Sequence, residues 1–269
     1  MTVCVVGGGG FVGRNVMDAL DNAFSIEYGE PLDFRNADTV IHLAANADVR
    51  DGWSQPFRDL RANTIFTARL LEAMRHQGVS RLLFASSSSV YGNAPIPTPE
   101  TYSGQQTSLY GASKLACEGL IGAYAEAGHV SATVFRFTSM LGRYYKHGLV
   151  ADFVKQFQET GRCNVLGGGS VARTRMHVED GVSAILHRFD EDPGYEVFNV
   201  GTDETVTSMA VALLVAHFLD IPAEVDVVGE SWVGDHPILL DCAKLRATGW
   251  APKYDIVDGI EDTVAWLTS

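Results

Sequence analysis

An apolar run near the start of the chain breaks into glycines and then resumes as a mixed segment. Val3–Val6 leads into Gly7 and Gly10, and Gly13 completes a GxxGxxG spacing ahead of residues 14–20. The first glycine of such a spacing allows a tight turn, the second lets a pyrophosphate approach the backbone, and the third lets helix and strand pack closely. A flexible linker is also rich in glycine, but it would not begin directly after a buried strand. The pattern predicts a strand, a dinucleotide-binding turn and a helix whose N-terminus faces phosphates.

The charge balance limits the partners that this chain can bind. Its 269 residues suit one large α/β domain or two lobes, and 46% of them are hydrophobic, which is enough for a sizeable core. A formal net charge of -13 repels nucleic acids and anionic membranes, and the sequence has no local basic patch to offset this. A small anionic ligand is compatible with this charge, because two or three arginines in a cleft can bind it. We expect no nucleic acid and no membrane among the partners.

The sequence shows neither a targeting segment nor a metal site. Met1 is followed directly by the first strand, so we expect a cytoplasmic protein. The longest apolar segment, Met209 to Leu219, is about half the length that a bilayer needs and contains His217, so it predicts a core helix. The cysteines lack CxxC spacing, and we expect reduced, mostly buried thiols and no bound metal. They are Cys4, Cys117, Cys163 and Cys242.

The region after the first helix is short for a parallel sheet. Residues 24–28 and 37–45 both predict strands. Consecutive parallel strands need a crossover of at least about 10 residues, yet Phe34 to Thr39 leaves no room for a helix. Either the chain has lost a crossover helix or residues are missing from this stretch, and the sequence leaves both alternatives open.

The acidic residue that binds an adenosine ribose normally follows the second strand. The short region leaves its identity open. The candidates are Asp21, Glu27 and Glu30. No arginine sits where it would obviously favour a 2′-phosphate, so NAD is expected over NADP.

A tyrosine and a lysine four residues apart open a later helix. Residues 63–76 have helical spacing ended by Gly78, and residues 79–92 predict a strand that runs into four serines. Tyr110 and Lys114 then lie on one helix face. A YxxxK motif alone is common, but it becomes specific beside an upstream serine at a strand end and a glycine-rich N-terminus.

Five short motifs occur in an order typical of one superfamily. They are Gly7–Gly13, His42–Ala45, Ser86–Gly92, Tyr110–Lys114 and His177–Asp180. With them the chain resembles the extended short-chain dehydrogenase/reductase superfamily. Within it, the chain is similar to the NAD-dependent nucleotide-sugar epimerases, such as the UDP-glucose 4-epimerases.

This resemblance implies the fold and its division. We expect an α/β protein with a Rossmann-type doubly wound parallel sheet and a smaller C-terminal α/β substrate lobe. Residues 1–143 would form the NAD-binding domain, to which residues 171–200 return. Residues 144–269 would form mainly the substrate-binding lobe.

The resemblance also implies a set of residues that bind NAD. They come from the glycine turn along the pyrophosphate, from the short second-strand region along the adenine, and from the segments along the cofactor's inner half. These are Gly7, Gly10, Phe11 and Val12, then Asp33 and Phe34, then Leu43, Ala44, Ala45 and Asn63, together with Tyr110 and Lys114. The apolar members can at the same time be core residues.

Ser87, Tyr110 and Lys114 are the catalytic residues that the resemblance implies. A sugar hydroxyl gives up a hydride from its carbon only if a base takes the hydroxyl proton. Tyr110 is expected to be that base in oxidation and the acid in reduction, with Lys114 and the cationic nicotinamide favouring its phenolate. Ser87 would hydrogen-bond the same oxygen, and Lys114 would also hold the nicotinamide ribose.

The substrate-binding residues are also implied by the resemblance. They are Ser87, Ser88, Ser139, Arg173 and Asp235. Ser139 stands where the family usually has an asparagine that touches the sugar, and Arg173 has the spacing of a diphosphate-binding arginine, although it could be a solvated surface charge. The second diphosphate arginine that usually precedes Asp235 is absent, which leaves affinity for a nucleotide sugar in doubt.

The expected reaction is 4-epimerisation of a nucleotide sugar, UDP-glucose or UDP-galactose, through a 4-keto sugar. The related 4,6-dehydratases have an Asp-Glu pair after the catalytic hydroxyl, where this chain has Ser88 and Ser89, so a dehydratase is disfavoured. The alternatives are a nucleotide-sugar or small-carbonyl reductase of the same superfamily, or a non-catalytic NAD-binding protein. Family likeness implies a homodimer through residues 63–76 and 110–125.

Overall fold

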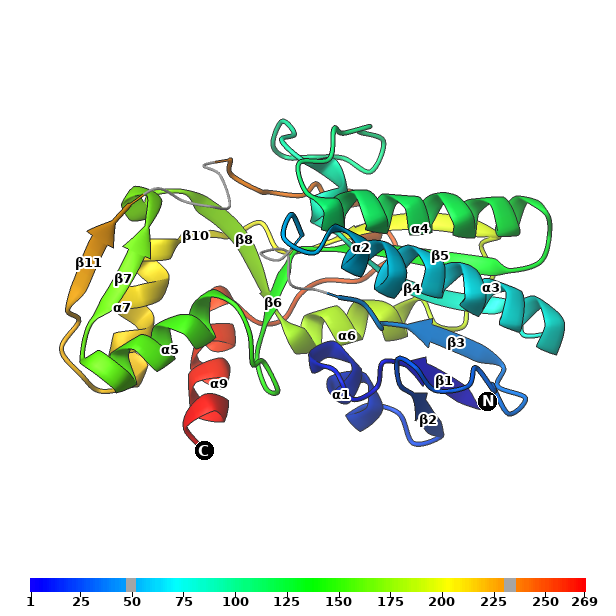
Figure 1. Ribbon diagram of the computed structural model, residues 1–269, viewed down its shortest axis with the longest axis horizontal. Helices are drawn as coiled ribbons and strands as arrows, with labels where there is room; N and C mark the ends of the chain where they lie inside the picture. The colour runs from blue at the N-terminus through cyan, green and yellow to red at the C-terminus, as the bar shows by residue number, and fades with distance from the viewer. Residues whose placement is uncertain (47–51, 230–235) are drawn as a thin grey trace.

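A six-stranded parallel sheet forms the larger part of the molecule (Figure 1). The computed structural model describes residues 1–46, 52–229 and 236–269. The strand order is β2-β1-β3-β4-β5-β9. The bounds are β1 Val3–Val6, β2 Ala23–Ile26, β3 Thr39–His42, β4 Arg81–Ser87, β5 Ser131–Phe137 and β9 Tyr195–Val200. The expected doubly wound α/β fold is confirmed.

Helices cover both faces of this sheet (Figure 1). Their bounds are α1 Phe11–Asp18, α3 Phe66–Gln77, α4 Leu109–Glu126 and α6 Val178–His187. One face packs on α3 and α4, where Ile121 is fully buried, and the other packs on α1 and α6 around Val16. Successive residues of β5, Val134 and Phe135, point into these opposite clusters. Burial on both faces explains the near-continuous apolar strands.

The connection from β2 to β3 contains no helix. Residues 27–38 form only turns and irregular backbone, and they pass β1, which lies between the two strands. The prediction that this stretch leaves no room for a crossover helix is confirmed. Phe34 anchors the connection, because its side chain is fully buried in the same apolar cluster as Leu70 and Met74 of α3.

Two short helical segments precede α3 without a break. They are α2 Pro56–Asp59 and the π-helical η2 Leu60–Ile65. The combined helix ends at Gly78, which adopts the left-handed conformation with φ of 75°. The predicted helix over residues 63–76 and its end at Gly78 are confirmed. A π-helical turn is a local irregularity of the kind often found at functional sites, and Asn63 lies within it.

Two small sheets and three helices form the second part of the molecule, at the left of Figure 1. The three-stranded sheet has the order β10-β8-β6, and β7 pairs with β11. The bounds are β6 Ser139–Leu141, α5 Leu149–Thr160, β7 Cys163–Leu166, β8 Ala172–His177, β10 Thr205–Thr207, α7 Ser208–Phe218, β11 Val225–Val228 and α9 Ile256–Thr268. Phe153, Val215 and Ile260 belong to the apolar cluster of this part, which is the expected smaller lobe.

Late segments of the chain return to the large sheet. α6 and β9 complete it, and Leu245 and Trp250 pack into its α6 side. β8, which precedes α6, belongs instead to the small sheet. The remaining short helices are η3 Ser88–Tyr91, η4 Gly167–Gly169 and α8 Ala243–Arg246. The division of the chain near residue 143 stays a prediction.

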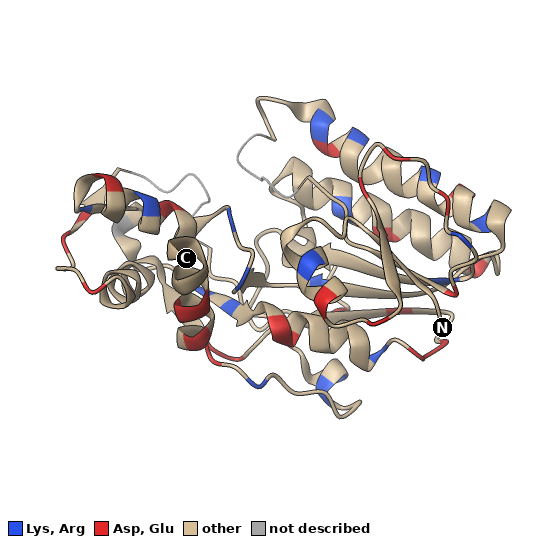
Figure 2. Ribbon diagram, turned by 90° about the horizontal axis from the view of Figure 1, so that it is seen from below, with Lys and Arg blue, Asp and Glu red and all other residues tan. Residues whose placement is uncertain are grey.

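The four cysteines are buried and unpaired, as expected. Burial raises the pKa of Cys4 and of Cys242 to about 12 and that of Cys163 to about 11. Within the described ranges, no helix is long and apolar enough to cross a membrane. The same ranges contain no group of three His, Cys, Asp or Glu side chains that could hold a metal ion. Basic and acidic side chains are interspersed over both parts of the molecule (Figure 2).

Candidate active site

The candidate residues converge on the carboxyl edge of the large sheet. Val6 pairs with Ile26 and with His42, and Ser87 pairs with Phe137. Because all these strands are parallel, the segments that follow them meet at one edge. Open α/β sheets bind their ligands at this edge.

The glycine turn after β1 has the geometry that a dinucleotide requires. Gly7 has φ of 91°, and a Cβ atom there would lie 2.7 Å from the Ala44 nitrogen. At Gly13 a Cβ atom would lie 2.0 Å from the Gly7 carbonyl oxygen, so only glycine fits. Gly10 is the N-cap of α1 and makes no side-chain cap. The first N–H groups of α1 are therefore available to a pyrophosphate beside Phe11.

The structure separates the three acids proposed for the adenosine ribose. Glu27 directly follows β2, and its Oε1 accepts a hydrogen bond from the Gly9 N–H at 2.8 Å. Glu30 turns back, and its Oε2 accepts from the Glu27 N–H at 2.7 Å. Asp21 precedes β2 and so lies at the other end of the strand. Glu27 alone places its carboxylate against the glycine turn.

The predicted adenine pair, Asp33 and Phe34, is divided between surface and core. Asp33 is exposed, and its Oδ1 accepts from the Arg35 N–H at 3.1 Å. Phe34 has no exposed surface, and its N–H donates to Gln77 Oε1 at 3.0 Å. Only Asp33 of this pair presents its side chain to a ligand.

The segment after β3 is tied to the glycine turn and to α4. The N–H groups of Leu43 and Ala44 both donate to the Val6 carbonyl oxygen, at 2.9 and 2.8 Å. Asn63 is nearly fully buried; its Oδ1 accepts from the Asn46 N–H at 2.8 Å and its Nδ2 donates to the Ser113 hydroxyl at 2.8 Å. Asn63 therefore positions this segment against α4, while Ala45 beside it is exposed.

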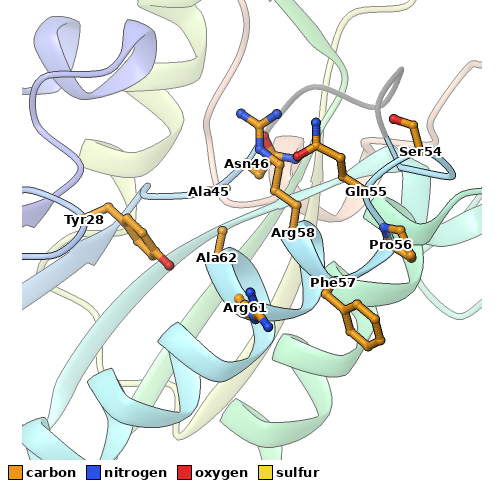
Figure 3. Close-up of a pocket in the computed structure, with 10 residues that line it drawn as sticks. All are labelled: Tyr28, Ala45, Asn46, Ser54, Gln55, Pro56, Phe57, Arg58, Arg61 and Ala62. Carbon is orange, nitrogen blue, oxygen red and sulfur yellow. The ribbon is translucent and has the colours of Figure 1, made fainter.

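A pocket of about 710 Å³ opens beside Ala45 (Figure 3). Tyr28, from the connection after β2, lines one side of it, and α2 and η2 line the other with Arg58 and Arg61. Tyr28 also packs against the Phe66 ring, with centroids 5.1 Å apart. The pocket thus adjoins the predicted adenosine end of the cofactor site. The two arginines bring positive charge to this end, which the sequence spacing did not indicate.

Ser87, Tyr110 and Lys114 come together at the sheet edge. Ser87 ends β4, and its hydroxyl accepts the Ser89 N–H at 3.2 Å. The helix that carries the other two begins with Ser108 as its N-cap, whose hydroxyl accepts from the Gly111 N–H at 3.0 Å. The Ser87 side chain lies close enough to Tyr110 to lower the pKa of its hydroxyl. Lys114 is nearly fully buried, and its Nζ donates to the Ala85 carbonyl oxygen at 2.6 Å.

Burial governs the protonation of this group in the chain alone. It raises the pKa of Tyr110 to about 12, and the nearby Ser87 hydroxyl only partly opposes it. Burial lowers the pKa of Lys114 to about 8. Removal from water disfavours the phenolate in the chain by itself, and its stabilisation by Lys114 together with the nicotinamide stays a prediction. Lys114 directs its ammonium to the backbone of β4, with Nζ 4.5 Å from the centre of the Phe84 ring.

The predicted substrate residues outside the catalytic group line the junction with the small lobe. Ser88 is half-buried in η3, and Ser139 is exposed on β6. Arg173 lies on β8, where it pairs with Val206 and forms a backbone bridge to Ile238. Asp235 lies outside the residues that the structure describes.

Comparison with models of protein families shows which family this chain belongs to. The model of the NAD dependent epimerase/dehydratase family matches residues 29–201, which is more than half of the chain. The chain belongs to this family.

Relatives within the epimerase/dehydratase family include both epimerases and dehydratases. A putative UDP-glucose 4-epimerase of Methanocaldococcus jannaschii is 25% identical over 98% of this chain and 98% of its own length. A dTDP-glucose 4,6-dehydratase of Mycolicibacterium smegmatis is 26% identical over 99% of this chain and 93% of its own length. The crystal structure of the Thermus thermophilus UDP-glucose 4-epimerase in complex with NAD superposes with a TM-score of 0.88, at 27% identity, over 100% of this chain and 99% of that one.

A buried charged network that the sequence analysis missed supports α4, the helix that carries Tyr110 and Lys114. Arg136 of β5 pairs with Glu118 of α4, with Nη2 and Oε2 2.6 Å apart. Arg136 also donates to the Tyr91 hydroxyl at 2.8 Å, and that hydroxyl donates to Asn199 Oδ1 at 2.6 Å. Ser86 donates to the other oxygen of Glu118. The available signal was the spacing of Glu118, four residues after Lys114 on the same helix face.

A second missed residue is Asp59, at the end of α2. Its side chain is almost fully buried; Oδ1 accepts from Asn46 Nδ2 at 2.7 Å, and Oδ2 makes no hydrogen bond with the described residues. Its negative charge is among the causes that raise the pKa of Tyr110, after burial. Asp59 is therefore an acidic neighbour of Tyr110, and no motif in the sequence indicated it.

Proposed function

We propose that this protein is a nucleotide-sugar 4-epimerase that interconverts UDP-glucose and UDP-galactose with NAD held in the site. The observation that supports it most is that Ser87, Tyr110 and Lys114 come together at the carboxyl edge of the sheet. The glycine turn, the open N-terminus of α1 and the Glu27 carboxylate fit a dinucleotide beside it.

The proposed roles follow from the positions of these side chains. Bound NAD supplies a hydride acceptor and donor for the sugar carbon. Tyr110 takes the proton of the sugar hydroxyl and later returns it to the same oxygen. Ser87 hydrogen-bonds that oxygen and keeps it within reach of Tyr110. Lys114, whose Nζ donates to the Ala85 carbonyl oxygen, holds the nicotinamide ribose.

Loss of water from the sugar, as in a dehydratase, receives less support. That reaction needs carboxyl groups to move protons, and the two positions after Ser87 are Ser88 and Ser89. Ser89 is itself occupied in a hydrogen bond with the Ser87 hydroxyl at 3.2 Å. Glu118, the acid on α4, is bound to Arg136 and Ser86. An epimerase therefore accounts better for these residues.

NAD is proposed over NADP because Glu27 meets the glycine turn, where a carboxylate suits ribose hydroxyls and repels a 2′-phosphate. Arg58 and Arg61 in the neighbouring pocket act in the opposite sense. Titration of the protein with both cofactors separates the two effects. We expect tighter binding of NAD.

A second candidate is a nucleotide-sugar reductase of the same family that exchanges its cofactor in each turnover. The observation that favours it is the connection of residues 27–38, which leaves the adenosine end without a covering helix. Retained cofactor after gel filtration would speak for the epimerase, and exchangeable cofactor for the reductase.

The proposed homodimer uses the faces of α3 and α4, which lie side by side in Figure 1. Exposed apolar side chains occur on this part of the surface at Phe57, Leu60, Ile65 and Leu115. Their burial against a second copy would be favourable. Light scattering of the purified protein gives the mass that tests this.

The experiment that tests the function is incubation of the purified protein with UDP-galactose and no added cofactor. Proton NMR follows the appearance of UDP-glucose. Conversion supports a self-contained 4-epimerase. No conversion, in protein shown to contain NAD after denaturation, contradicts this substrate and leaves the fold and cofactor assignments intact.

A further inference from the structure

Arg175 of β8 is a buried cation whose charge is balanced by no carboxylate among the described residues. Its exposed fraction is 8%, and its Nε atom is buried without a hydrogen bond to any described residue. In residues 1–46, 52–229 and 236–269, no ion pair joins it to an acid. Burial lowers the pKa of Arg175, and the nearby charge of Arg173 lowers it further. Such a group is costly to bury unless an anion meets it.

The other buried arginines show what a structural guanidinium looks like in this protein. Arg136, with 9% exposed, is held by Glu118, Tyr91 and the Glu100 carbonyl oxygen. Arg81, also with 9% exposed, shares the buried Nε without a hydrogen bond to the described residues, but its Nη2 donates to Thr133 Oγ1 at 2.9 Å and to the Arg188 carbonyl oxygen at 2.8 Å. Arg175 has no comparable set among the described residues. The difference points to a partner that binds from outside the chain.

The surroundings of Arg175 favour an anion. Tyr145 is its neighbour and is the group that opposes the lowering of its pKa. The Tyr145 hydroxyl lies against Gly148, since a Cβ atom there would be 2.2 Å from it. Gly148 is the N-cap of the 12-residue α5 and makes no side-chain cap. The open helix N-terminus and the guanidinium thus both adjoin Tyr145, and the one acid in the first turn, Asp152, has an exposed side chain.

Strand register connects this place to the active site. Arg175 pairs with Ser139 of β6, which lies two residues after Phe137, the partner of Ser87. On the other side, the Tyr145 ring packs edge-on against Phe11 of α1, with centroids 5.3 Å apart. Arg175 therefore lies between the catalytic serine and the glycine turn. Arg173, two residues earlier, is about 7 Å away along the same side of the strand.

We propose that Arg175 binds the substrate diphosphate, together with Arg173 and the N-terminus of α5. This inference rests on the proposed nucleotide-sugar function. The sequence has no arginine in the segment just before Asp235. The inference assigns the second positive charge for the diphosphate to Arg175 of β8 instead. A planar guanidinium binds two oxygens of a phosphate at once. The substrate class is thus one with a diphosphate ester next to the sugar.

The test compares Arg175→Met with the wild type by calorimetric titration of the NAD-loaded protein. The probes are UDP, inorganic pyrophosphate and uridine. We expect Arg175→Met to weaken the binding of UDP and of pyrophosphate at least tenfold. The affinity for uridine should stay unchanged, because uridine has no phosphate. The melting temperature without ligand should stay equal or rise, since the variant removes an unbalanced buried charge.

The matched control is Arg162→Met, which removes a cation from the same lobe. Arg162 is exposed and pairs with Glu224 and Asp226, so its loss should leave all three affinities unchanged. If Arg175→Met does not fold, Arg175→Lys replaces it in the test, because lysine keeps the positive charge but lacks the planar guanidinium that binds two phosphate oxygens at once. We expect Arg175→Lys to weaken UDP binding two- to tenfold.

Three outcomes would overturn the proposal. Unchanged UDP and pyrophosphate affinities in Arg175→Met would show that Arg175 does not bind the diphosphate. An equal loss of affinity for uridine would indicate general damage to the nucleotide-binding surface. A weaker affinity for NAD with an unchanged affinity for UDP would show that Arg175 binds the pyrophosphate of the cofactor instead.

The proposal and the proposed function can fail separately. Pyrophosphate carries no base or sugar, so its binding tests Arg175 even if UDP-galactose is not converted. Conversion of UDP-galactose with unchanged affinities in Arg175→Met would keep the epimerase and remove this inference.

Discussion

The carboxyl edge of the large sheet and the small three-stranded sheet are built differently. Ser87, Tyr110 and Lys114, the proposed catalytic residues, stand on seven-residue β4 and 18-residue α4, which the buried Glu118–Arg136 pair joins to β5. The small sheet has the three-residue strands β6 and β10 on either side of six-residue β8, with an exposed Ser139 on β6 and a buried Arg175 on β8. Long packed elements suit side chains that must keep a fixed geometry. We therefore expect the edge of the large sheet to set the reaction and the small sheet to set which molecule is bound.

The largest expected effect comes from Tyr110→Phe at the edge of the large sheet. The variant lacks the group that exchanges the hydroxyl proton, so turnover should fall by ~10²–10⁴-fold while NAD stays bound. Its counterpart on the small sheet is Ser139→Ala, which should change KM by less than about tenfold. The rate of UDP-glucose formation by NMR measures both. A near-normal rate in Tyr110→Phe would contradict the expected difference in the effects of substitutions in the two regions.

The next effect compares the two buried arginines. Arg136→Met leaves the Glu118 carboxylate buried without its cation, so the free energy of unfolding should fall by about 3–5 kcal/mol. Arg175→Met leaves no such carboxylate and should not destabilise the protein. Urea titration followed by tryptophan fluorescence gives both values. Equal losses would mean that Arg175 is as structurally engaged as Arg136.

A smaller effect is expected at the glycine turn. Gly13→Ala puts a Cβ atom 2.0 Å from the Gly7 carbonyl oxygen, so the turn must shift, at a cost of about 1–3 kcal/mol. NAD affinity should fall at least tenfold by titration. Gly119→Ala on α4, where nothing lies within 4 Å, is the matched control and should bind NAD normally. Similar NAD affinities in the two variants would contradict a pyrophosphate at this turn.

The smallest effect is a shift in pH dependence from Asp59→Asn. Removal of the negative charge near Tyr110 takes away one cause of its raised pKa, so the phenolate forms at lower pH. The alkaline rise of kcat/KM should therefore move to lower pH, by up to about one unit. Glu159→Gln, an exposed acid on α5, removes the same charge far from the site and should leave the profile in place. A shift in the opposite direction would exclude this electrostatic role.

Much of the fold could be predicted because its signals are local. The Gly7–Gly13 spacing, the end of a helix at Gly78 and the helix that begins near Tyr110 all appear in the structure. Thr207 caps α7 by accepting from the Ala210 N–H at 3.1 Å. These features depend on a few neighbouring residues, so a single sequence contains them.

The rest depends on contacts between distant segments. The pairing of Glu118 with Arg136, the approach of Asp59 to Tyr110 and the choice of Glu27 over Asp21 follow from how strands and helices pack. The sequence indicated Lys114 as a partner of Tyr110, but it could not show that the ammonium turns to the Ala85 carbonyl oxygen. Burial, which governs the pKa of Tyr110, is also a property of the folded chain only.

The four buried cysteines can serve as probes of local opening of the structure. A thiol with a pKa of about 12, such as Cys4 or Cys242, has roughly one molecule in 10⁵ ionised at pH 7. An alkylating reagent therefore reacts with it mainly while the surrounding structure is open. Cys4 reports on the large sheet and Cys163 on the small lobe. The order in which mass spectrometry finds them modified tells which half of the molecule opens first.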